Sequence, residues 1–187
     1  MADTDVIVVG GGPAGLSAAL FASKNGLDAV AFDTDKTWMH KAHLFNYLGI
    51  RSMDGDVFLD RAREQATADH GVTLHEETEV TAIEQDADGF VVTADGEDHT
   101  AAYLVLATGA NRDLAEELGC AFTDEDVVDV DVTMETSVAD AYATGAMVRA
   151  EEWQAVISAG DGAAAALNIL TKEKGEHYHD FDTPADV

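Results

Sequence analysis

The sequence has a single cysteine, Cys120, and two prolines among 187 residues. With one thiol, the chain by itself can form no intramolecular disulfide, no Cys-x-x-Cys redox pair and no cysteine-based zinc cluster. No uninterrupted apolar run approaches the roughly 20 residues of a membrane-spanning helix, so no membrane span is expected. Hydrophobic residues still make up 47% of the chain. This length and composition predict one globular domain with a sizeable core.

Basic residues are scarce: 10 Lys and Arg stand against 37 Asp and Glu, and the formal net charge is -27. Such a charge opposes binding to nucleic acid and, in dilute buffer, a compact fold, whereas molar salt shortens the Debye length to about 3 Å. The evenly acidic, lysine-poor composition resembles that of proteins from extreme halophiles; an acidic protein from an ordinary cytosol is the alternative. No basic segment precedes the first apolar run, so we expect no signal peptide and a cytoplasmic location, in a high-salt cytosol.

Residues 5–32 have the pattern of a strand, a helix and a second strand. Residues 5–9 are a β-branched apolar run, typical of a strand covered on both faces. A helix is predicted from Pro13, which a first helical turn tolerates, towards Gly26, which can end it. A second strand at 29–32 completes a βαβ unit.

The remainder of the chain mixes loops, short strands and two helices. Residues 33–51 show no clear period and are predicted to form a long loop. Strand-like runs at 72–74, 79–83 and 90–93, separated by turn residues, predict an antiparallel meander. The other predicted elements are an amphipathic helix over 54–70, a buried strand at 103–106, a weaker strand around 126–132, a short strand at 142–143 and a final helix over 151–172. We predict one domain over 1–173 and a polar tail over 174–187.

Gly10, Gly12 and Gly15 have the spacing Gly-x-Gly-x-x-Gly between the first predicted strand and the helix. In this context Gly10 can form the tight turn, Gly12 can let the backbone approach a pyrophosphate and Gly15 can allow close helix–strand packing. The helix N-terminus adds unpaired N–H groups and a favourable dipole. Asp33 ends the second strand. Its separation from Gly15, the last glycine of the motif, is close to the roughly 20 residues expected of an acid that binds the ribose. The pattern predicts a dinucleotide site; in the alternative, the glycines only shape a turn and Asp33 is a surface acid.

The glycine motif and three further segments together indicate which dinucleotide is expected. Residues 10–19 (GGGPAGLSAA), 107–110 (ATGA), 153–156 (WQAV) and 159–162 (AGDG) occur in an order that resembles the FAD domain of the thioredoxin reductase family. The resemblance extends over nearly the whole chain. It implies FAD as the cofactor and an α/β, Rossmann-like FAD-binding domain, with a mostly parallel sheet flanked by helices and an antiparallel β-meander crossover.

The resemblance also assigns roles to individual positions. The first glycine motif would hold the FAD pyrophosphate, and the Ala-Thr-Gly segment would close the site. Backbone N–H groups of Gln154 and Ala155 would stabilise negative charge on the reduced flavin ring. Asn46 would contact the ring, and Val80 would lie near the adenine. The implied cofactor-binding residues are Gly10, Gly12, Pro13, Ala14, Gly15, Asp33, Asn46, Val80, Ala107, Thr108, Gly109, Gly145, Ala146, Gln154 and Ala155.

The sequence departs from the family in three ways that bear on function. The family carries an NAD(P)H domain, with its own glycine fingerprint and a Cys-x-x-Cys, where this chain has only the short stretch from Gly109 to Gly145. We therefore do not expect this chain alone to reduce thioredoxin. Ala146 stands where the family has an Asp that binds the ribityl chain, and one charge-assisted hydrogen bond is worth about 1.5–3 kcal/mol. The family's Gly-Gly-Gln segment also has no counterpart here, so weakened FAD binding is expected.

These observations predict a small, single-domain FAD-dependent oxidoreductase that takes its electrons from outside the chain. The sequence leaves open whether the donor is free NAD(P)H, a separate reductase, or an iron–sulfur or thiol protein. A non-catalytic flavin-binding scaffold and the FAD subunit of a split reductase are alternatives. The resemblance further implies a homodimer, although no residue pattern specifies one.

Other candidate groups have simpler explanations. His40 and His43 are hypothetical acid/base groups or metal ligands, but loop histidines more often pack or face solvent. His177 and His179 are hypothetical metal ligands, but they lie in the predicted polar tail, which gives them no fixed scaffold. Cys120 is expected to be a buried structural thiol rather than a reactive one. No metal site and no catalytic residue are predicted.

Overall fold

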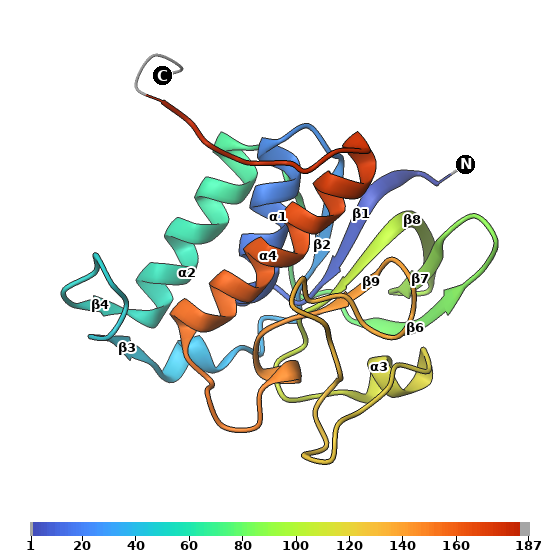
Figure 1. Ribbon diagram of the computed structural model, residues 1–187. Coiled ribbons are helices and arrows are strands. Elements are labelled where there is room, and N and C mark those ends of the chain that lie inside the picture. The colour runs from blue at the N-terminus through green and yellow to red at the C-terminus, as the bar shows by residue number, and fades with distance from the viewer. Residues whose placement is uncertain (1, 184–187) are drawn as a thin grey trace.

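A seven-stranded sheet forms the centre of the computed structural model, which describes residues 2–183 (Figure 1). The strand order is β5-β2-β1-β8-β7-β6, and β9 also pairs with β8. Pairing is parallel from β5 through β2 and β1 to β8 and between β8 and β9, and antiparallel in the meander β6-β7-β8. This arrangement confirms the predicted fold class. The strands are β1 (Thr4–Val9), β2 (Ala29–Phe32), β5 (Thr73–His75), β6 (Val80–Gln85), β7 (Phe90–Ala94), β8 (Glu97–Leu106) and β9 (Ala141–Ala143).

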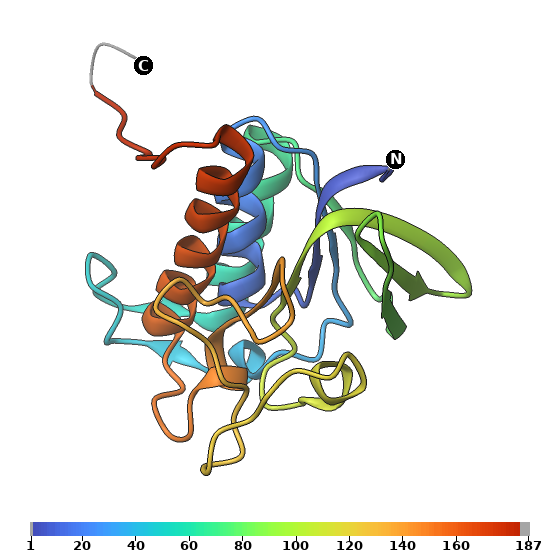
Figure 2. The same cartoon turned by 45° about the vertical axis from the view of Figure 1, so that its right-hand side comes forward.

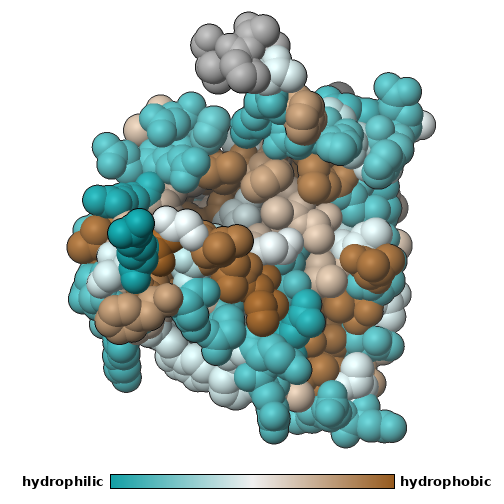
Figure 3. Space-filling model, turned by 60° about the vertical axis from the view of Figure 1, so that its left-hand side comes forward, coloured by the Kyte–Doolittle hydropathy of each residue, from teal (hydrophilic) through white to brown (hydrophobic). Residues whose placement is uncertain are grey.

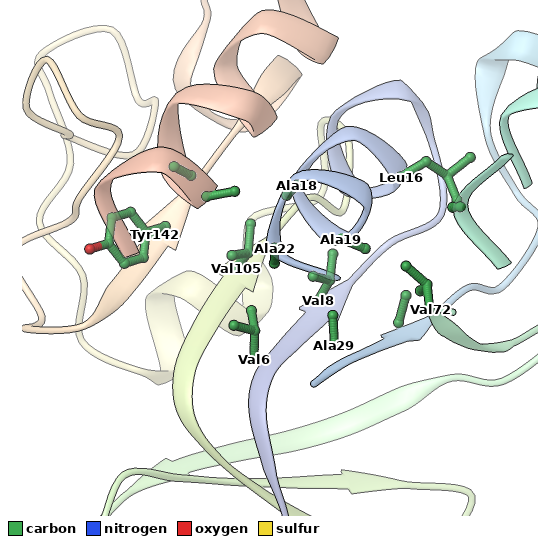
Figure 4. Close-up of a cluster of buried hydrophobic side chains, with 14 of the residues drawn as sticks. Val6, Val8, Leu16, Ala18, Ala19, Ala22, Ala29, Val72, Val105 and Tyr142 are labelled. Atoms are coloured by element: carbon green, nitrogen blue, oxygen red, sulfur yellow. The ribbon is translucent and has the colours of Figure 1, made fainter. Parts of the chain in front are cut away.

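Three helices cover one face of this sheet, and Figure 2 shows them stacked on the side opposite the meander. Figure 4 shows Val6 and Val8 of β1 and Val105 of β8 directed towards the first of these helices. Ile7 and Val9, the alternate residues of β1, pack on the other face with the meander. Burial on both faces is why this strand reads as a continuous apolar run. The helices are α1 (Pro13–Lys24), α2 (Gly55–Glu64) and α4 (Ala155–Lys174).

Helices α1 and α4 pack with their backbones in close contact at Gly162. A Cβ atom on Gly162 would overlap the Ala14 carbonyl oxygen and lie 2.9 Å from its carbon and 3.1 Å from the Ala18 nitrogen. By contrast, a Cβ on Gly160, in the same helix, would meet open space. Helix α4 begins four residues later than predicted and ends at Lys174 against Gly175, whose φ of +67° suits glycine at a helix C-terminus.

The predicted loop over residues 33–51 contains short elements that lead to α2. The 3-10 helix η1 (Trp38–Lys41) precedes two two-residue strands, β3 (His43–Leu44) and β4 (Met53–Asp54), which pair with each other apart from the main sheet. Asp54 caps α2 by accepting a hydrogen bond from the Asp56 N–H at 3.1 Å. The helical path then continues through the π-turn η2 (Gln65–Asp69).

The prediction that residues 72–74 belong to the meander is wrong. The observed strand β5 pairs parallel to β2 at the edge of the sheet. The ring of His75 stacks on Phe32 of β2, with ring centroids 5.0 Å apart. A three-residue run carries no local signal for its partner, so the tertiary contact with Phe32 decides the pairing.

The predicted strand around residues 126–132 is also wrong. Only isolated bridges form there, between Phe122 and Val128 and between Val130 and Thr136. Asp126 and Met134 have φ values of 60° and 70°, which interrupt an extended backbone. The crossover from β8 to β9 is therefore largely irregular, with α3 (Asp113–Glu117) at its start and η3 (Gly145–Val148) just after β9.

The segment after α4 returns along the molecule to α1. The Tyr178 hydroxyl donates to Asn25 Oδ1, and Lys24 Nζ lies 2.7 Å from Asp180 Oδ1. The predicted domain and tail include residues 1 and 184–187, which lie outside the described residues. Over residues 2–183, no helix has both the length and the apolar character needed to cross a membrane.

Candidate functional site

A cleft of about 900 Å³ lies at the carboxyl ends of β1, β2 and β8. This volume is within the range of roughly 300–1,000 Å³ of ligand pockets, and ligands of open α/β sheets bind outside the carboxyl ends of the strands. All predicted cofactor-binding residues except Gly15 line the cleft: Gly10, Gly12, Pro13, Ala14, Asp33, Asn46, Val80, Ala107, Thr108, Gly109, Gly145, Ala146, Gln154 and Ala155. Segments far apart in the sequence thus meet around one space.

The three glycines of the motif have different surroundings. Gly10 has a φ of +117°, and a Cβ there would overlap the Ala107 carbonyl, so this position requires glycine. A Cβ on Gly15 would overlap the Gly10 carbonyl, which explains why Gly15 packs behind the cleft rather than lining it. Gly12 differs, because a Cβ there would meet only Thr37 Oγ1, at 3.4 Å, and would otherwise enter the cleft. The cradle that a pyrophosphate needs is therefore open at Gly12.

Two helix N-termini open onto the same cleft. Gly12 is the N-cap of α1 and Gln154 that of α4, and neither end has a side-chain cap. The first N–H groups of a helix lack intrahelical acceptors, and the dipole makes this end partly positive. The Gln154 N–H donates to the Glu152 carbonyl at 2.9 Å, so the donors that remain at α4 begin with Ala155. Both ends favour a ligand with negative charge at two separate points.

Asp33 lines the cleft but is held from behind by Arg63 of α2. Arg63 Nη2 lies 2.9 Å from Asp33 Oδ2, and Arg63 also pairs with Asp35 and Glu76. Asp33 Oδ1 accepts the Asp35 N–H at 3.1 Å. The Arg63 guanidinium, with His40 beside it, lowers the pKa of Asp35. No local pattern in the sequence points to Arg63, because it lies 30 residues from Asp33.

Replacing Arg63 with leucine is expected to lower the free energy of unfolding by about 3 kcal/mol, because the buried Asp33 carboxylate would lose its partner. Urea unfolding measures the loss. The double variant R63L/D33N should recover most of it, since the buried carboxylate is then removed and the other two partners of Arg63, Asp35 and Glu76, are solvent-exposed enough to stay charged. Arg61, on the same helix and exposed, provides the control: R61L should change stability by no more than about 0.5 kcal/mol. Equal losses in R61L and R63L would contradict the role of the pair.

His40 joins the loop to α2 through two carboxylates. Its Nδ1 lies 2.6 Å from Asp56 Oδ1 and its Nε2 2.9 Å from Asp35 Oδ1, and these hydrogen bonds raise the pKa of His40. Both ring nitrogens are therefore engaged. His43 instead bonds Ser52 Oγ at 2.9 Å and packs against Phe45. In the part of the chain that the structure describes, no group of three or more His, Cys, Asp or Glu side chains could hold a metal ion.

The raised pKa of His40 predicts a pH dependence of stability. The unfolded-state pKa is about 6.5, so the stabilising contribution is fully present below that pH and is lost as pH rises through the higher folded-state pKa. The stability difference between wild type and H40Q, measured by urea unfolding from pH 5.5 to 9, should be largest at the acidic end and vanish at the basic end. A difference independent of pH would contradict this assignment.

Two contacts join the loop over residues 33–51 to the start of α4 at the mouth of the cleft. Asn46 Nδ2 donates to Gln154 Oε1 at 2.7 Å, and the rings of Trp38 and Trp153 pack with centroids 5.1 Å apart. All four side chains line the cleft. The sequence predicted roles for Asn46 and Gln154, but the tryptophan pair joins segments too distant for any sequence pattern to connect.

The segment after β9 is held by arginines that the prediction missed. Arg112 donates to the carbonyls of Ala146 at 3.1 Å and Met147 at 3.0 Å, and Arg149 pairs with the buried Asp161 of α4 at 2.6 Å. Ala146 lines the cleft and offers no side-chain acceptor. Cys120 is buried, as predicted, and this burial raises the pKa of its thiol.

Comparison with known proteins identifies the family of this chain. The model of the pyridine nucleotide-disulphide oxidoreductase family matches residues 4–57 and 48–162. The chain belongs to this family. Within it, the chain is similar to thioredoxin reductases: that of Spironucleus barkhanus is 30% identical over 119 residues, or 61% of this chain. The predicted resemblance to the thioredoxin reductase family is confirmed.

Solved structures show the same fold. A thioredoxin reductase from Gloeobacter violaceus superposes with a TM-score of 0.86 at 19% identity, covering 98% of this chain and 100% of that chain. A ferredoxin-flavin thioredoxin reductase from Clostridium acetobutylicum gives 0.78 at 16%, covering 92% and 99%. The sequence match spans only 38% of the Spironucleus barkhanus reductase, so this chain corresponds to part of that relative's length.

Proposed function

We propose that this chain binds FAD in the cleft and acts as an oxidoreductase that receives electrons from another molecule. The observation that carries the proposal is the convergence of the glycine turn, Asp33, the Ala-Thr-Gly segment and the start of α4 on one cleft of ligand size. The donor set fits the cofactor: Gly12 leaves room for a pyrophosphate, and two uncapped helix ends supply N–H donors. When bound, FAD supplies a ring that accepts and passes on two electrons.

Different residues of this chain would bind different parts of FAD. The N–H groups at the start of α1 bind and orient the phosphates. Asp33, held in place by Arg63, accepts a hydrogen bond from the ribose. The N–H groups that begin at Ala155 stabilise negative charge on the ring, and Trp38 and Trp153 exclude water from the mouth of the cleft.

A second candidate is a flavin-binding scaffold without turnover, and the observation that favours it is Ala146. This side chain cannot accept a hydrogen bond from the ribityl group, although its neighbours line the cleft. The FAD subunit of a split reductase is a third candidate.

Electron donors compatible with the proposal include free NAD(P)H and an iron–sulfur protein. The likeness to the ferredoxin-flavin thioredoxin reductase of Clostridium acetobutylicum supports the iron–sulfur protein. A cytoplasmic, high-salt location and a homodimer also belong to this proposal.

The first experiment is an absorption spectrum of protein purified in molar potassium chloride, followed by identification of the nucleotide released by heat. A two-band flavin spectrum with FAD released is the expected result. Titration of the apoprotein with FAD should quench its tryptophan fluorescence, because both tryptophans of the chain line the cleft. A colourless protein that takes up no added FAD would overturn the proposal, and bound FAD that no donor reduces would favour the scaffold.

A further inference from the structure

Residues 36–53 contain no Asp or Glu, in a chain that has 37 of them. A longer acid-free stretch, 6–27, is built into β1 and α1, whereas most of 36–53 is exposed. The exposed cations Lys36, Lys41 and Arg51 lie within it. A strongly acidic surface is thus interrupted by one segment of opposite charge, hereafter the 36–53 surface.

Two of the three cations of this surface, Lys41 and Arg51, are available to another molecule. Lys41, Arg51 and Arg61 of α2 have no carboxylate within 4.0 Å among residues 2–183, although acids outnumber bases almost fourfold. The remaining cations are occupied. Lys36, within the surface, and Lys24, Arg63, Arg149 and Lys172, outside it, pair with carboxylates, whereas Arg112 binds carbonyls and Lys174 lies over a tyrosine ring. Two of the three unpaired cations among residues 2–183 therefore lie in the 36–53 surface.

The same surface presents large apolar side chains. Trp38 is 57% exposed, Phe45 73% and Leu48 92%. Figure 3 shows the face that carries β3 and β4, where hydrophobic side chains interrupt the hydrophilic exterior. Trp38 and Asn46 also line the cleft, so the surface begins at the rim of the candidate site. Apolar anchors flanked by unpaired charges are the composition of a protein interface.

We propose that the 36–53 surface docks an acidic protein that delivers electrons to the cleft; the delivery rests on the proposed function. Charge complementarity selects this partner, because Lys41 and Arg51 can pair with acids that the rest of the surface would repel. A second copy fits less well, since a two-fold interface places the same patch against itself and brings its cations together. Two reduced partner molecules would dock in turn and each be oxidised by one electron, which together would supply the two electrons that bound FAD can accept, with protons taken from solvent.

The test separates docking from electron transfer. An acidic [2Fe–2S] carrier is the probe, and basic cytochrome c is its control; affinity is measured by isothermal titration with both proteins oxidised. K41E and R51E should each weaken binding of the acidic carrier about tenfold. K174E makes the same charge change at the last residue of α4, about 30 Å along the helix from Ala155 at the cleft, and should leave the affinity within about twofold. Neither Lys41 nor Arg51 lines the cleft, so FAD content should not change.

The apolar side chains of the 36–53 surface are tested with a variant and a matched control. L48S should also weaken binding, whereas V132S, an equally exposed site on the β8–β9 crossover, should not. Absence of binding to the wild type, tighter binding of cytochrome c, or equal losses in K41E and K174E would each overturn the proposal. Sedimentation showing a dimer that L48S dissociates would assign the surface to a second copy instead. Failure of dithionite to reduce bound FAD would refute only the proposed function, because the affinities are measured without electron transfer.

Discussion

Replacing Gly12 with valine is expected to abolish FAD retention while the chain stays folded. The backbone at Gly12 has φ -80° and ψ -173°, which valine adopts without strain, and the new side chain would point into the cleft past Thr37 Oγ1. There it would occupy the space that the pyrophosphate needs. A loss of at least about a hundredfold in affinity, or about 2.7 kcal/mol, is expected. Titration of tryptophan fluorescence with FAD measures it, and circular dichroism monitors the fold.

The matched control is G160V, the same substitution in open space on the exposed side of α4. This variant should retain the wild-type ratio of FAD to protein. G15V provides the opposite contrast, because its side chain would overlap the Gly10 carbonyl and disturb the fold itself. Normal flavin content in G12V would remove the assignment of the glycine turn to the pyrophosphate.

Replacing Gly162 with alanine is expected to lower the free energy of unfolding by about 3 kcal/mol or more. Inserting one methyl group into a packed core usually costs about 1–3 kcal/mol. Here it would meet the Ala14 carbonyl, which is backbone and cannot rotate away, so α1 and α4 would have to separate along their contact. Guanidinium unfolding of the FAD-free protein measures the effect without any contribution from ligand binding.

Gly160 again provides the comparison, two residues away in the same helix. G160A should raise the free energy of unfolding by about 0.5–1 kcal/mol, because alanine has the higher helix propensity and nothing opposes its methyl group. The two variants thus differ in sign for one chemical change. If G162A were as stable as G160A, the close backbone contact between α1 and α4 would be refuted.

The fold could be predicted wherever local pattern and tertiary structure agree. The predicted strand at residues 5–9 and the helix starting at Pro13 correspond to β1 and α1, because a β-branched run and a glycine turn specify them locally. Only residues 103–106 of β8 were predicted, since residues 97–100 are mostly polar and depend on pairing with β7. The partner of β5 could not be deduced either, because three residues do not encode a neighbour.

The candidate site likewise contains residues that the sequence indicates and residues that only the tertiary structure brings together. The glycine turn and Asp33 carry their own signals, and the family resemblance supplied Asn46 and Gln154. Arg63 had no such signal, since its carboxylate partners come from other segments and only the docking of α2 brings them within reach. The contact between Trp38 and Trp153 likewise depends on tertiary structure. Residues that hold other residues in place are the part of a site that sequence patterns miss.

The packing of α1 against α4 has a consequence for how the chain folds as it is synthesised. Helix α1 leaves the ribosome well before α4, but Ala18 and Ala22 are buried in a core that α4 completes through Ala165 and Ile169. The pairing of β1 with β8 is similarly distant in sequence. Such non-local contacts place the rate-limiting step late and slow folding. Until α4 emerges, the nascent chain exposes the apolar face of α1, which is when this protein is most open to misassembly.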